Sequence, residues 1–325
     1  MPEIPYPARI VFLDRATIAP HIVVKRPTFP HEWIEHARTA PGEVVPRLAG
    51  ATVAITNKVR LDADTLAKLP DLKMIAVAAT GTDVIDLAAA KARGIVVSNI
   101  RGYAVESVPE HVFALMLALS RNLAQYRDEV LAGRWQSEAQ YCFFNRPIRD
   151  LAGLTLGIVG AGSLGRAVAA LADAFGMTIL FHSRTTAEPV AVGRYVALND
   201  LLKWSDVVTL HLPLTDASRG LIGAEQLALM RRTAILINTA RGGIVDEAAL
   251  LAALESGRIA GAALDVTSPE PPPADAPIMR IARLPNALVT PHVAWASDGA
   301  MQTLADQLIA NIEAWERDAP RNVVG

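Results

Sequence analysis

The sequence predicts an α/β protein built from two doubly wound parallel sheets. Its 325 residues exceed a typical single domain, and 51% of them are hydrophobic, which is enough for two cores. Short apolar runs of strand type alternate with alanine- and leucine-rich helical stretches along nearly the whole chain. This alternation is typical of parallel strands with helices on both faces of the sheet. A glycine fingerprint, Gly160 to Gly165, separates one such strand from its helix.

The strands and helices form two series along the chain. In the first series, strands are expected at Ala8–Leu13, Thr52–Thr56, Met74–Ala78 and Ile95–Val97, with helices at Asp62–Leu69 and Asp86–Arg93. The second series has six expected strands, at Leu156–Val159, Thr178–Phe181, Val207–Leu210, Ala234–Asn238, Gly261–Leu264 and Leu288–Thr290. Six strands match the two halves of a dinucleotide-binding sheet. A last helix is expected over Met301–Arg317.

The segment between the two series has a different character. Val112–Leu119 is apolar nearly all round, which predicts a buried helix. Gln125–Arg149 has few helical signals and carries several aromatic residues. We expect it to form an irregular arm that covers either a partner subunit or a cleft.

The fingerprint predicts a nucleotide site. Gly160 makes the tight turn, Gly162 admits a pyrophosphate, and Gly165 lets helix and strand pack closely. The phosphates then lie at the positive end of the helix that begins after the turn.

Composition excludes several other classes of protein. The net charge is −2 without runs of like charge, so neither nucleic acid nor an anionic membrane is an expected partner. Cys142 is the only cysteine, which excludes an internal disulfide or zinc cluster and fits a cytoplasmic location. No metal site is expected. Neither a secretory signal nor an apolar run long enough to cross a bilayer is expected.

Three polar residues follow three strands of the second series. Arg241 lies in Asn238–Gly243, Glu270 follows Asp265 in a proline-rich segment, and His292 follows Thr290-Pro291. Ligands bind outside the carboxyl ends of parallel strands, so these side chains are expected to converge. A histidine suits proton transfer near neutral pH, a glutamate can orient its ring, and the planar guanidinium of an arginine can bind a carboxylate through two hydrogen bonds.

These motifs together resemble the D-isomer-specific 2-hydroxyacid dehydrogenases over nearly the whole chain, from the Ala79–Asp83 loop to the last helix. Within the family, the chain is most similar to the hydroxypyruvate/glyoxylate reductases (glycerate dehydrogenases). The positions that carry this similarity are Gly102-Tyr103, Ser107-Val108, Glu110-His111, Trp135-Gln136 and Cys142–Phe144.

The resemblance implies reduction of a small 2-oxoacid, hydroxypyruvate or glyoxylate, to the D-2-hydroxyacid by hydride transfer from NAD(P)H. His292 is then the acid, Glu270 its partner and Arg241 the carboxylate ligand, with backbone N–H groups of Thr80 and Gly81 completing the substrate site. The implied cofactor contacts are Ser163 and Leu164 at the pyrophosphate, Leu212 and Pro213 at the adenosine, Thr239 and Ala240 at the nicotinamide ribose, Asp265 at the carboxamide and Val108 beside the nicotinamide.

The end of the second strand bears on cofactor choice. NAD sites usually place an Asp or Glu there, whereas this strand ends in His182-Ser183-Arg184. Asp173 comes earlier and Glu188 later. Serine and arginine suit a 2′-phosphate, so NADP(H) is favoured, with NAD(H) as the alternative.

The resemblance also implies a Rossmann-type cofactor domain inserted in a flavodoxin-like substrate domain. Residues 1–101 and 293–325 are expected to form the substrate domain and 102–292 the NAD(P)-binding domain, with a dimerisation helix and arm at 103–149. A homodimer is expected. Alternatives are a phosphoglycerate or lactate-type specificity, or a non-catalytic NAD(P)-sensing protein on the same fold.

Overall fold

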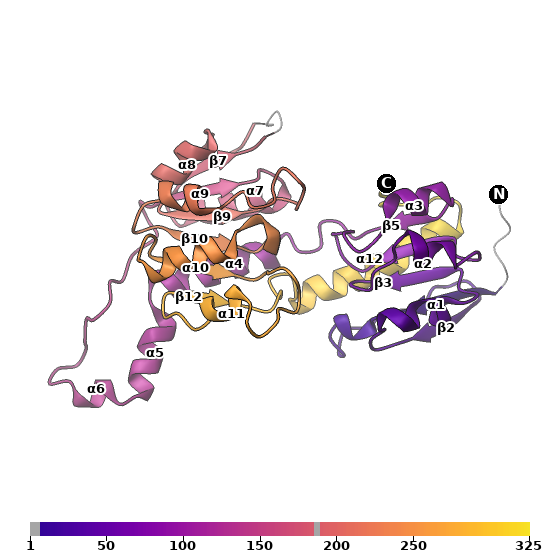
Figure 1. Cartoon of the computed structure of the whole chain (residues 1–325), viewed down its shortest axis with the longest axis horizontal. Coiled ribbons are helices and arrows are strands. Elements are labelled where there is room, and N and C mark those ends of the chain that lie inside the picture. The colour runs from indigo at the N-terminus through magenta and orange to yellow at the C-terminus, as the bar shows by residue number, and fades with distance from the viewer. Residues whose placement is uncertain (1–6, 185–188) are drawn as a thin grey trace. The chain divides into compact units, whose positions relative to one another are not determined.

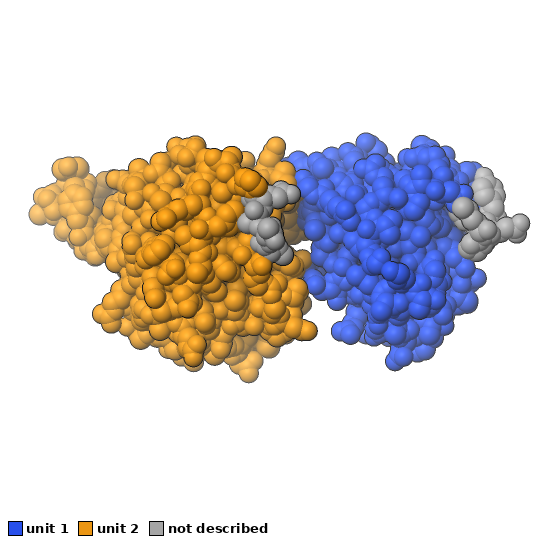
Figure 2. Space-filling view, turned by 90° about the horizontal axis from the view of Figure 1, so that it is seen from above, with its two compact units in different colours: residues 1–103, 296–325 blue, residues 104–295 orange. Residues whose placement is uncertain are grey.

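The computed structural model describes residues 7–184 and 189–325, and it divides into two compact units (Figures 1 and 2). The first unit comprises Met1–Tyr103 and Ala296–Gly325, and the second comprises Ala104–Trp295. Both chain crossings come slightly later than the boundaries expected from the sequence.

The first unit is a five-stranded parallel sheet in the order β2-β1-β3-β4-β5, the flavodoxin-like order. Its strands are β1 (Ala8–Phe12), β2 (His31–Glu35), β3 (Val53–Thr56), β4 (Met74–Val77) and β5 (Val96–Ser98). Helices α1 (Val44–Leu48), α2 (Ala63–Ala67) and α3 (Leu87–Ala92) share one core with the sheet, and α12 (Asp298–Glu316) packs against β4. Short 3₁₀ turns lie at Arg15–Thr17 and Pro41–Glu43.

Strand β2 was not expected from the sequence. Its residues His-Glu-Trp-Ile-Glu are all partly or fully exposed, because β2 pairs with β1 alone at the edge of the sheet. An edge strand needs no continuous apolar run and often carries charge. The sequence pattern therefore lacks the signal that reveals β1, β3 and β4.

The second unit has a seven-stranded parallel sheet in the order β12-β11-β10-β9-β6-β7-β8 (Figure 1). Its strands are β6 (Thr155–Val159), β7 (Thr178–His182), β8 (Arg194–Tyr195), β9 (Val207–Leu210), β10 (Ile235–Asn238), β11 (Gly261–Leu264) and β12 (Ala287–Val289). The order reverses between β6 and β9, as in the Rossmann fold. The predicted α/β class with two doubly wound sheets is confirmed, with the two-residue β8 as an addition.

Helices cover both faces of this second sheet. On one face, α4 (Ser107–Ser120) packs against α7 (Ser163–Ala174) and strands β10 to β12. On the other face lie α8 (Leu198–Trp204), α9 (Ala224–Leu229), α10 (Glu247–Glu255) and α11 (Pro277–Ile281), which share a single core with the sheet. A 3₁₀ turn at Gly242–Ile244 precedes α10. The predicted burial of Val112–Leu119 fits α4, where Val112, Phe113, Leu115, Met116 and Leu119 are buried.

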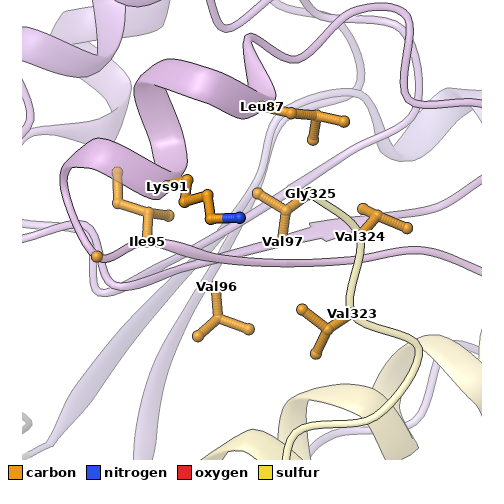
Figure 3. Close-up of a pocket in the computed structure, with 9 residues that line it drawn as sticks. Leu87, Lys91, Ile95, Val96, Val97, Val323, Val324 and Gly325 are labelled. Atoms are coloured by element: carbon orange, nitrogen blue, oxygen red, sulfur yellow. The ribbon is translucent and has the colours of Figure 1, made fainter.

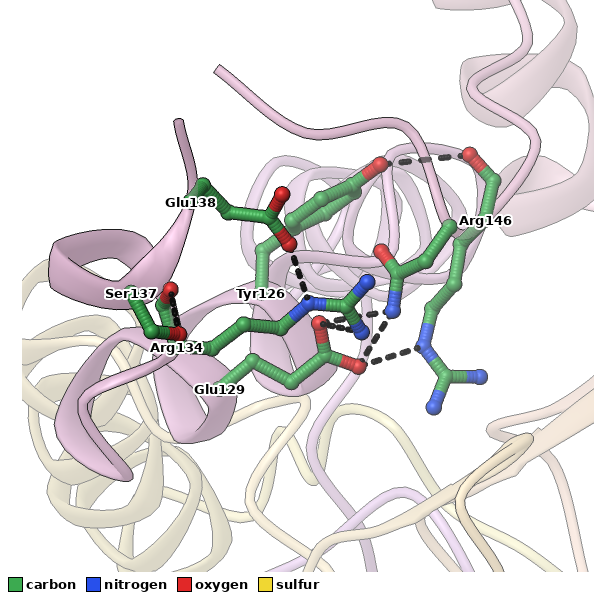
Figure 4. Close-up of polar contacts among 7 residues, drawn as sticks. Tyr126, Glu129, Arg134, Ser137, Glu138 and Arg146 are labelled. Atoms are coloured by element: carbon green, nitrogen blue, oxygen red, sulfur yellow. Dashed lines mark hydrogen bonds and ion pairs between the residues drawn. The ribbon is translucent and has the colours of Figure 1, made fainter. Parts of the chain in front are cut away.

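The arm is more regular than its sequence suggests. It contains α5 (Leu123–Leu131) and α6 (Arg134–Ser137), where an irregular segment was expected. Glu129 of α5 forms ion pairs with Arg134 at 3.3 Å and Arg146 at 3.5 Å (Figure 4). Arg134 also lies over the ring of Phe143, 4.8 Å from its centroid. These contacts join both ends of the arm and give its helices tertiary support that an apolar periodicity in the sequence does not reveal.

His211, at the end of β9, predicts how stability depends on pH. Burial lowers the pKa of its imidazole to about 4, and the ring bonds through Nε2 to Thr209 Oγ1 at 3.0 Å. In the unfolded chain the His211 imidazole takes up a proton near pH 6.5, whereas in the folded protein it does so only near pH 4. The buried neutral ring therefore costs no stability above pH 6.5, and the free energy of unfolding falls as the pH drops from 6.5 toward 4. We expect a loss of about 2 kcal/mol in the free energy of unfolding over that range, allowing for the partly exposed residue.

Urea unfolding at a series of pH values measures this effect. His211→Gln should flatten the slope of the free energy of unfolding against pH between pH 6.5 and 4. An identical slope in wild type and His211→Gln contradicts the assignment.

Candidate active site

Three neighbouring strands of the second unit carry polar residues at their carboxyl ends. Arg241 follows β10, Asp265 follows β11 and His292 follows β12. The strands are paired in parallel, so the segments that follow them leave the same edge of the sheet.

His292 and Glu270 form a hydrogen-bonded pair. Nδ1 of His292 lies 2.7 Å from Oε2 of Glu270, and the two side chains are 25% and 28% exposed. With Nδ1 held by the carboxylate, the ring presents Nε2 as its second nitrogen. The other carboxylate oxygen, Oε1, accepts the backbone N–H of Thr267 at 3.2 Å. The pair is therefore fixed in orientation and still reachable by a small molecule.

The backbone around His292 is held in an uncommon conformation by Asp265. His292 has a φ of 58°, in the left-handed region that few non-glycine residues adopt. The buried Asp265 carboxylate accepts the Thr290 hydroxyl at 2.6 Å and the N–H groups of Val293 and Ala294, each at 2.9 Å. Its carbonyl accepts the N–H of His292 at 2.8 Å. Sequence reasoning assigned Asp265 only to the cofactor and missed this structural role.

Two side chains of helix α4 also form hydrogen bonds with the loop that carries His292. Ser107 Oγ donates to the carbonyl of Ala294 at 2.7 Å, and His111 Nε2 lies 3.1 Å from Thr290 Oγ1. Trp295 Nε1 donates to the carbonyl of His292 at 3.0 Å. The two contacts from α4 join residues 187 and 179 positions apart, so no local sequence pattern predicts them.

The segment that carries Arg241 is held by a buried asparagine. Asn238 Nδ2 donates to the carbonyl of Arg241 at 2.9 Å, while its Oδ1 accepts the N–H of Ala240 at 3.0 Å. The partly exposed guanidinium of Arg241 donates from Nη1 to the carbonyl of Ala240 at 2.8 Å. Gly242 follows, and a Cβ there would lie 2.0 Å from the carbonyl carbon of Thr267. The backbone after β10 thus packs directly on the backbone after β11.

The glycine fingerprint forms a cradle at the start of α7. A Cβ on Gly165 would lie 2.0 Å from the carbonyl oxygen of Gly160, and one on Gly160 would lie 2.3 Å from that of His211. At Gly162 a Cβ would meet nothing within 4 Å, so the space in front of the helix is open. The N-cap residue, Gly162, has no side chain to cap the helix, and the N–H groups of the first turn suit an anion.

Thr239 supplies a second sign of a ligand site. Its hydroxyl oxygen is buried and has no hydrogen-bond partner among the described residues. A buried polar group without a partner is costly, and a ligand hydroxyl at this point relieves the cost. The open cradle and the orphaned hydroxyl fit a phosphate- and ribose-bearing cofactor.

The remaining predicted cofactor residues occupy three places in the second unit. Val108 is buried in α4, and Leu212 and Pro213 follow β9, with Leu212 beside Gly160. Ser183 and the exposed Arg184 follow β7, whereas Glu188 lies outside the described residues.

Thr80 and Gly81 belong to the first unit, where they follow β4. Thr80 Oγ1 donates to the carbonyl of Ile100 at 2.7 Å, and the carbonyl of Thr80 accepts Asn99 Nδ2 at 2.8 Å. This local network fixes the backbone of the loop.

A cavity of about 220 Å³ lies elsewhere in the first unit (Figure 3). Leu87, Lys91, Val97 and the C-terminal Val323–Gly325 line it, and it contains none of the predicted site residues. Within residues 7–184 and 189–325, no group of three His, Cys, Asp or Glu side chains is placed to hold a metal ion. Among the same residues, no helix is long and apolar enough to span a bilayer.

The chain is similar to known proteins over nearly its whole length. Residues 113–294 match the family model described as D-isomer specific 2-hydroxyacid dehydrogenase, NAD binding domain. The chain is 54% identical to glycerate dehydrogenase of Methylorubrum extorquens over 97% of its own length and 98% of the relative. It superposes with a TM-score of 0.85 and 29% identity on an NADPH-dependent glyoxylate/hydroxypyruvate reductase of Sinorhizobium meliloti, covering 98% of each chain. A D-lactate dehydrogenase of Aquifex aeolicus, solved with NAD and lactic acid, matches with a TM-score of 0.81 and 29% identity over 95% of this chain and 96% of that one.

Proposed function

Because this chain belongs to the D-isomer specific 2-hydroxyacid dehydrogenase family, we propose that it reduces hydroxypyruvate or glyoxylate to the corresponding D-2-hydroxyacid. The family resemblance expected from the sequence is confirmed, and the chain is an oxidoreductase that acts on CH–OH donors with a nicotinamide cofactor. The finer choice of substrate rests on the names of its relatives, which include hydroxypyruvate and glyoxylate reductases.

The observation that carries the proposal is the His292–Glu270 pair at 2.7 Å. Glu270 orients the ring through Nδ1, and Nε2 then holds the proton that the developing alkoxide requires. Arg241 binds the substrate carboxylate with its planar donor fork. In the oxidation direction, the same Nε2 accepts the proton from the hydroxyl group.

A steady-state assay tests this function. Oxidation of NADPH and NADH is followed at a fixed cofactor concentration with hydroxypyruvate, glyoxylate, pyruvate, phenylpyruvate and 3-phosphohydroxypyruvate. The highest kcat/KM is expected with hydroxypyruvate or glyoxylate. A preference for the phosphorylated acid or for pyruvate instead assigns the phosphoglycerate or lactate-type alternative, and no turnover with any acid contradicts the proposal.

The second unit is proposed to hold the cofactor. Bound NAD(P)H supplies the hydride for the carbonyl carbon. The cradle residues Gly160, Gly162, Ser163, Leu164 and Gly165 bind its pyrophosphate at the start of α7. The rest of the proposed binding set is Val108, Ser183, Arg184, Leu212, Pro213, Thr239, Ala240 and Asp265. The first unit, which carries Thr80 and Gly81, is proposed as the substrate-binding unit.

NADP(H) is the proposed cofactor form, because Ser183 and Arg184 follow β7 where NAD sites usually have a carboxylate. We expect a higher kcat/KM with NADPH than with NADH. Arg184→Ala should lower kcat/KM for NADPH by about 10-fold, since one charge-assisted contact to the 2′-phosphate is lost. The same variant should leave the NADH value nearly unchanged, which makes NADH the internal control. A wild-type preference for NADH contradicts the assignment.

A homodimer formed through α4 and the arm is also proposed. Six of the eleven exposed large apolar side chains in the described part of the chain lie on α5 and the rest of the arm, at Leu123, Leu131, Trp135, Tyr141, Phe144 and Ile148. Such a concentration marks an interaction surface. Sedimentation equilibrium should give twice the 34.7 kDa chain mass, and Leu131→Glu combined with Tyr141→Glu should give the monomer.

A further inference from the structure

Besides its contact with His292, Glu270 is linked to the start of α10 by two consecutive hydrogen bonds through Thr267. Thr267 Oγ1 donates to Glu247 Oε1 at 2.6 Å, and the backbone N–H of Thr267 donates to Glu270 Oε1 at 3.2 Å. Glu270 in turn bonds through Oε2 to His292 at 2.7 Å. Thr267 is therefore the residue through which Glu247 acts on the orientation of the His292–Glu270 pair.

The segment from Arg241 to the start of α10 contacts Thr267 twice, through the backbone at Gly242 and through the side chain of Glu247. Gly242 leaves room for the Thr267 backbone, because a Cβ at 242 would lie 2.0 Å from its carbonyl carbon. Glu247 lies five residues further on, at the first position of α10, where Asp246 caps the helix by accepting two backbone N–H groups. The helix start is thus a rigid support for the Glu247 carboxylate.

We propose that Thr267 and Glu247 are positioning residues that set the Glu270 carboxylate, and through it His292, for proton transfer. The inference rests on the proposed function of His292 and Glu270. Neither Thr267 nor Glu247 belongs to the proposed substrate-binding set. The hydrogen bond between the Thr267 hydroxyl and the Glu247 carboxylate joins two segments of the site. One segment leads from Arg241 to α10, and the other carries Glu270.

The experiment compares Thr267→Val with Thr267→Ser. Valine keeps the shape and the backbone N–H but lacks the hydroxyl, whereas serine keeps the donor. We expect Thr267→Val to lower kcat with hydroxypyruvate by about 10-fold, with KM within about 2-fold, since a hydrogen bond to a charged group is lost. Thr267→Ser should recover kcat to within about 3-fold of wild type.

Two further measurements separate positioning from general loosening of the structure. Glu247→Ala in the Thr267→Val background should add almost nothing to the loss, because both changes break the same bond. The matched control is Thr28→Val in the first unit, where Thr28 Oγ1 donates to Glu313 Oε1 at 3.0 Å; it should leave kcat unchanged. Melting temperatures of all variants identify any that fail to fold.

A readout without turnover keeps this inference distinct from the proposed function. If Nδ1 of His292 carries the proton, we expect a downfield ¹H NMR signal from it, which is assigned by its absence in His292→Asn. This signal should broaden or move upfield in Thr267→Val and stay in place in Thr267→Ser. Unchanged kcat and an unchanged signal in Thr267→Val, or additive effects of the two substitutions, overturn the positioning role. A wild type that reduces no 2-oxoacid overturns the proposed function instead, and the NMR comparison still reports on positioning.

Discussion

Replacement of His292 by asparagine is expected to lower kcat for 2-oxoacid reduction by about 10²–10⁴-fold, the usual contribution of a positioned general acid. In the wild type, Glu270 Oε2 lies 2.7 Å from Nδ1 of the His292 ring. The side-chain amide of asparagine still offers an N–H donor to this carboxylate. An amide does not release a proton near neutral pH, so the chemical step loses its acid while the loop keeps its partner. KM should change by only a few-fold.

Steady-state kinetics and a cofactor-binding titration check this result, and the affinity for NADPH should stay close to that of wild type. The chain provides a matched control, since His21 also pairs with a carboxylate, Asp298, at 2.8 Å on the exposed surface of the first unit. His21→Asn should retain full kcat. A His292→Asn variant that keeps more than about a tenth of wild-type kcat excludes His292 as the proton donor.

The sequence predicted the class of the fold and the strand ends that carry the site, because both depend on local patterns. Buried strands such as β6 and β9 are continuous apolar runs, and the fingerprint is a local turn. Strand β2 was not predicted, because an edge strand needs no continuous apolar run. The arm helices α5 and α6 were not predicted either, because their support includes ion pairs around Glu129 that an apolar periodicity does not reveal.

The support of the site depends on contacts between residues distant in the sequence. Nothing local to Asp265 shows that its carboxylate accepts two N–H groups of the His292 loop, 28 and 29 residues further on. The left-handed φ of His292 is a consequence of that support. The bond between Thr267 and Glu247 likewise spans 20 positions. Motifs therefore indicate the candidate side chains, while the packing between segments shows what holds them in place.

Substitution of Arg241 by lysine is expected to lower kcat/KM for hydroxypyruvate by about 10²-fold. Lysine keeps the positive charge but presents a flexible point donor instead of a planar fork. A carboxylate held by two parallel N–H···O bonds then loses at least one charge-assisted bond, worth about 1.5–3 kcal/mol. Asn238 and Gly242 hold the Arg241 backbone, so the segment should keep its path in the variant.

Whether the lower kcat/KM of Arg241→Lys comes from kcat or from KM shows what the guanidinium group of Arg241 does. If Arg241 only binds the carboxylate, KM rises and kcat is retained, whereas a contribution to polarising the carbonyl also lowers kcat. Arg280→Lys, at an exposed arginine paired with Glu255 at 2.8 Å in the same unit, is the control and should change neither constant. Guanidinium ion added to Arg241→Ala should restore part of the lost activity, because it returns the planar donor without the side chain. Retention of wild-type kcat/KM in Arg241→Lys means that charge alone suffices and that the fork has no part in binding the substrate.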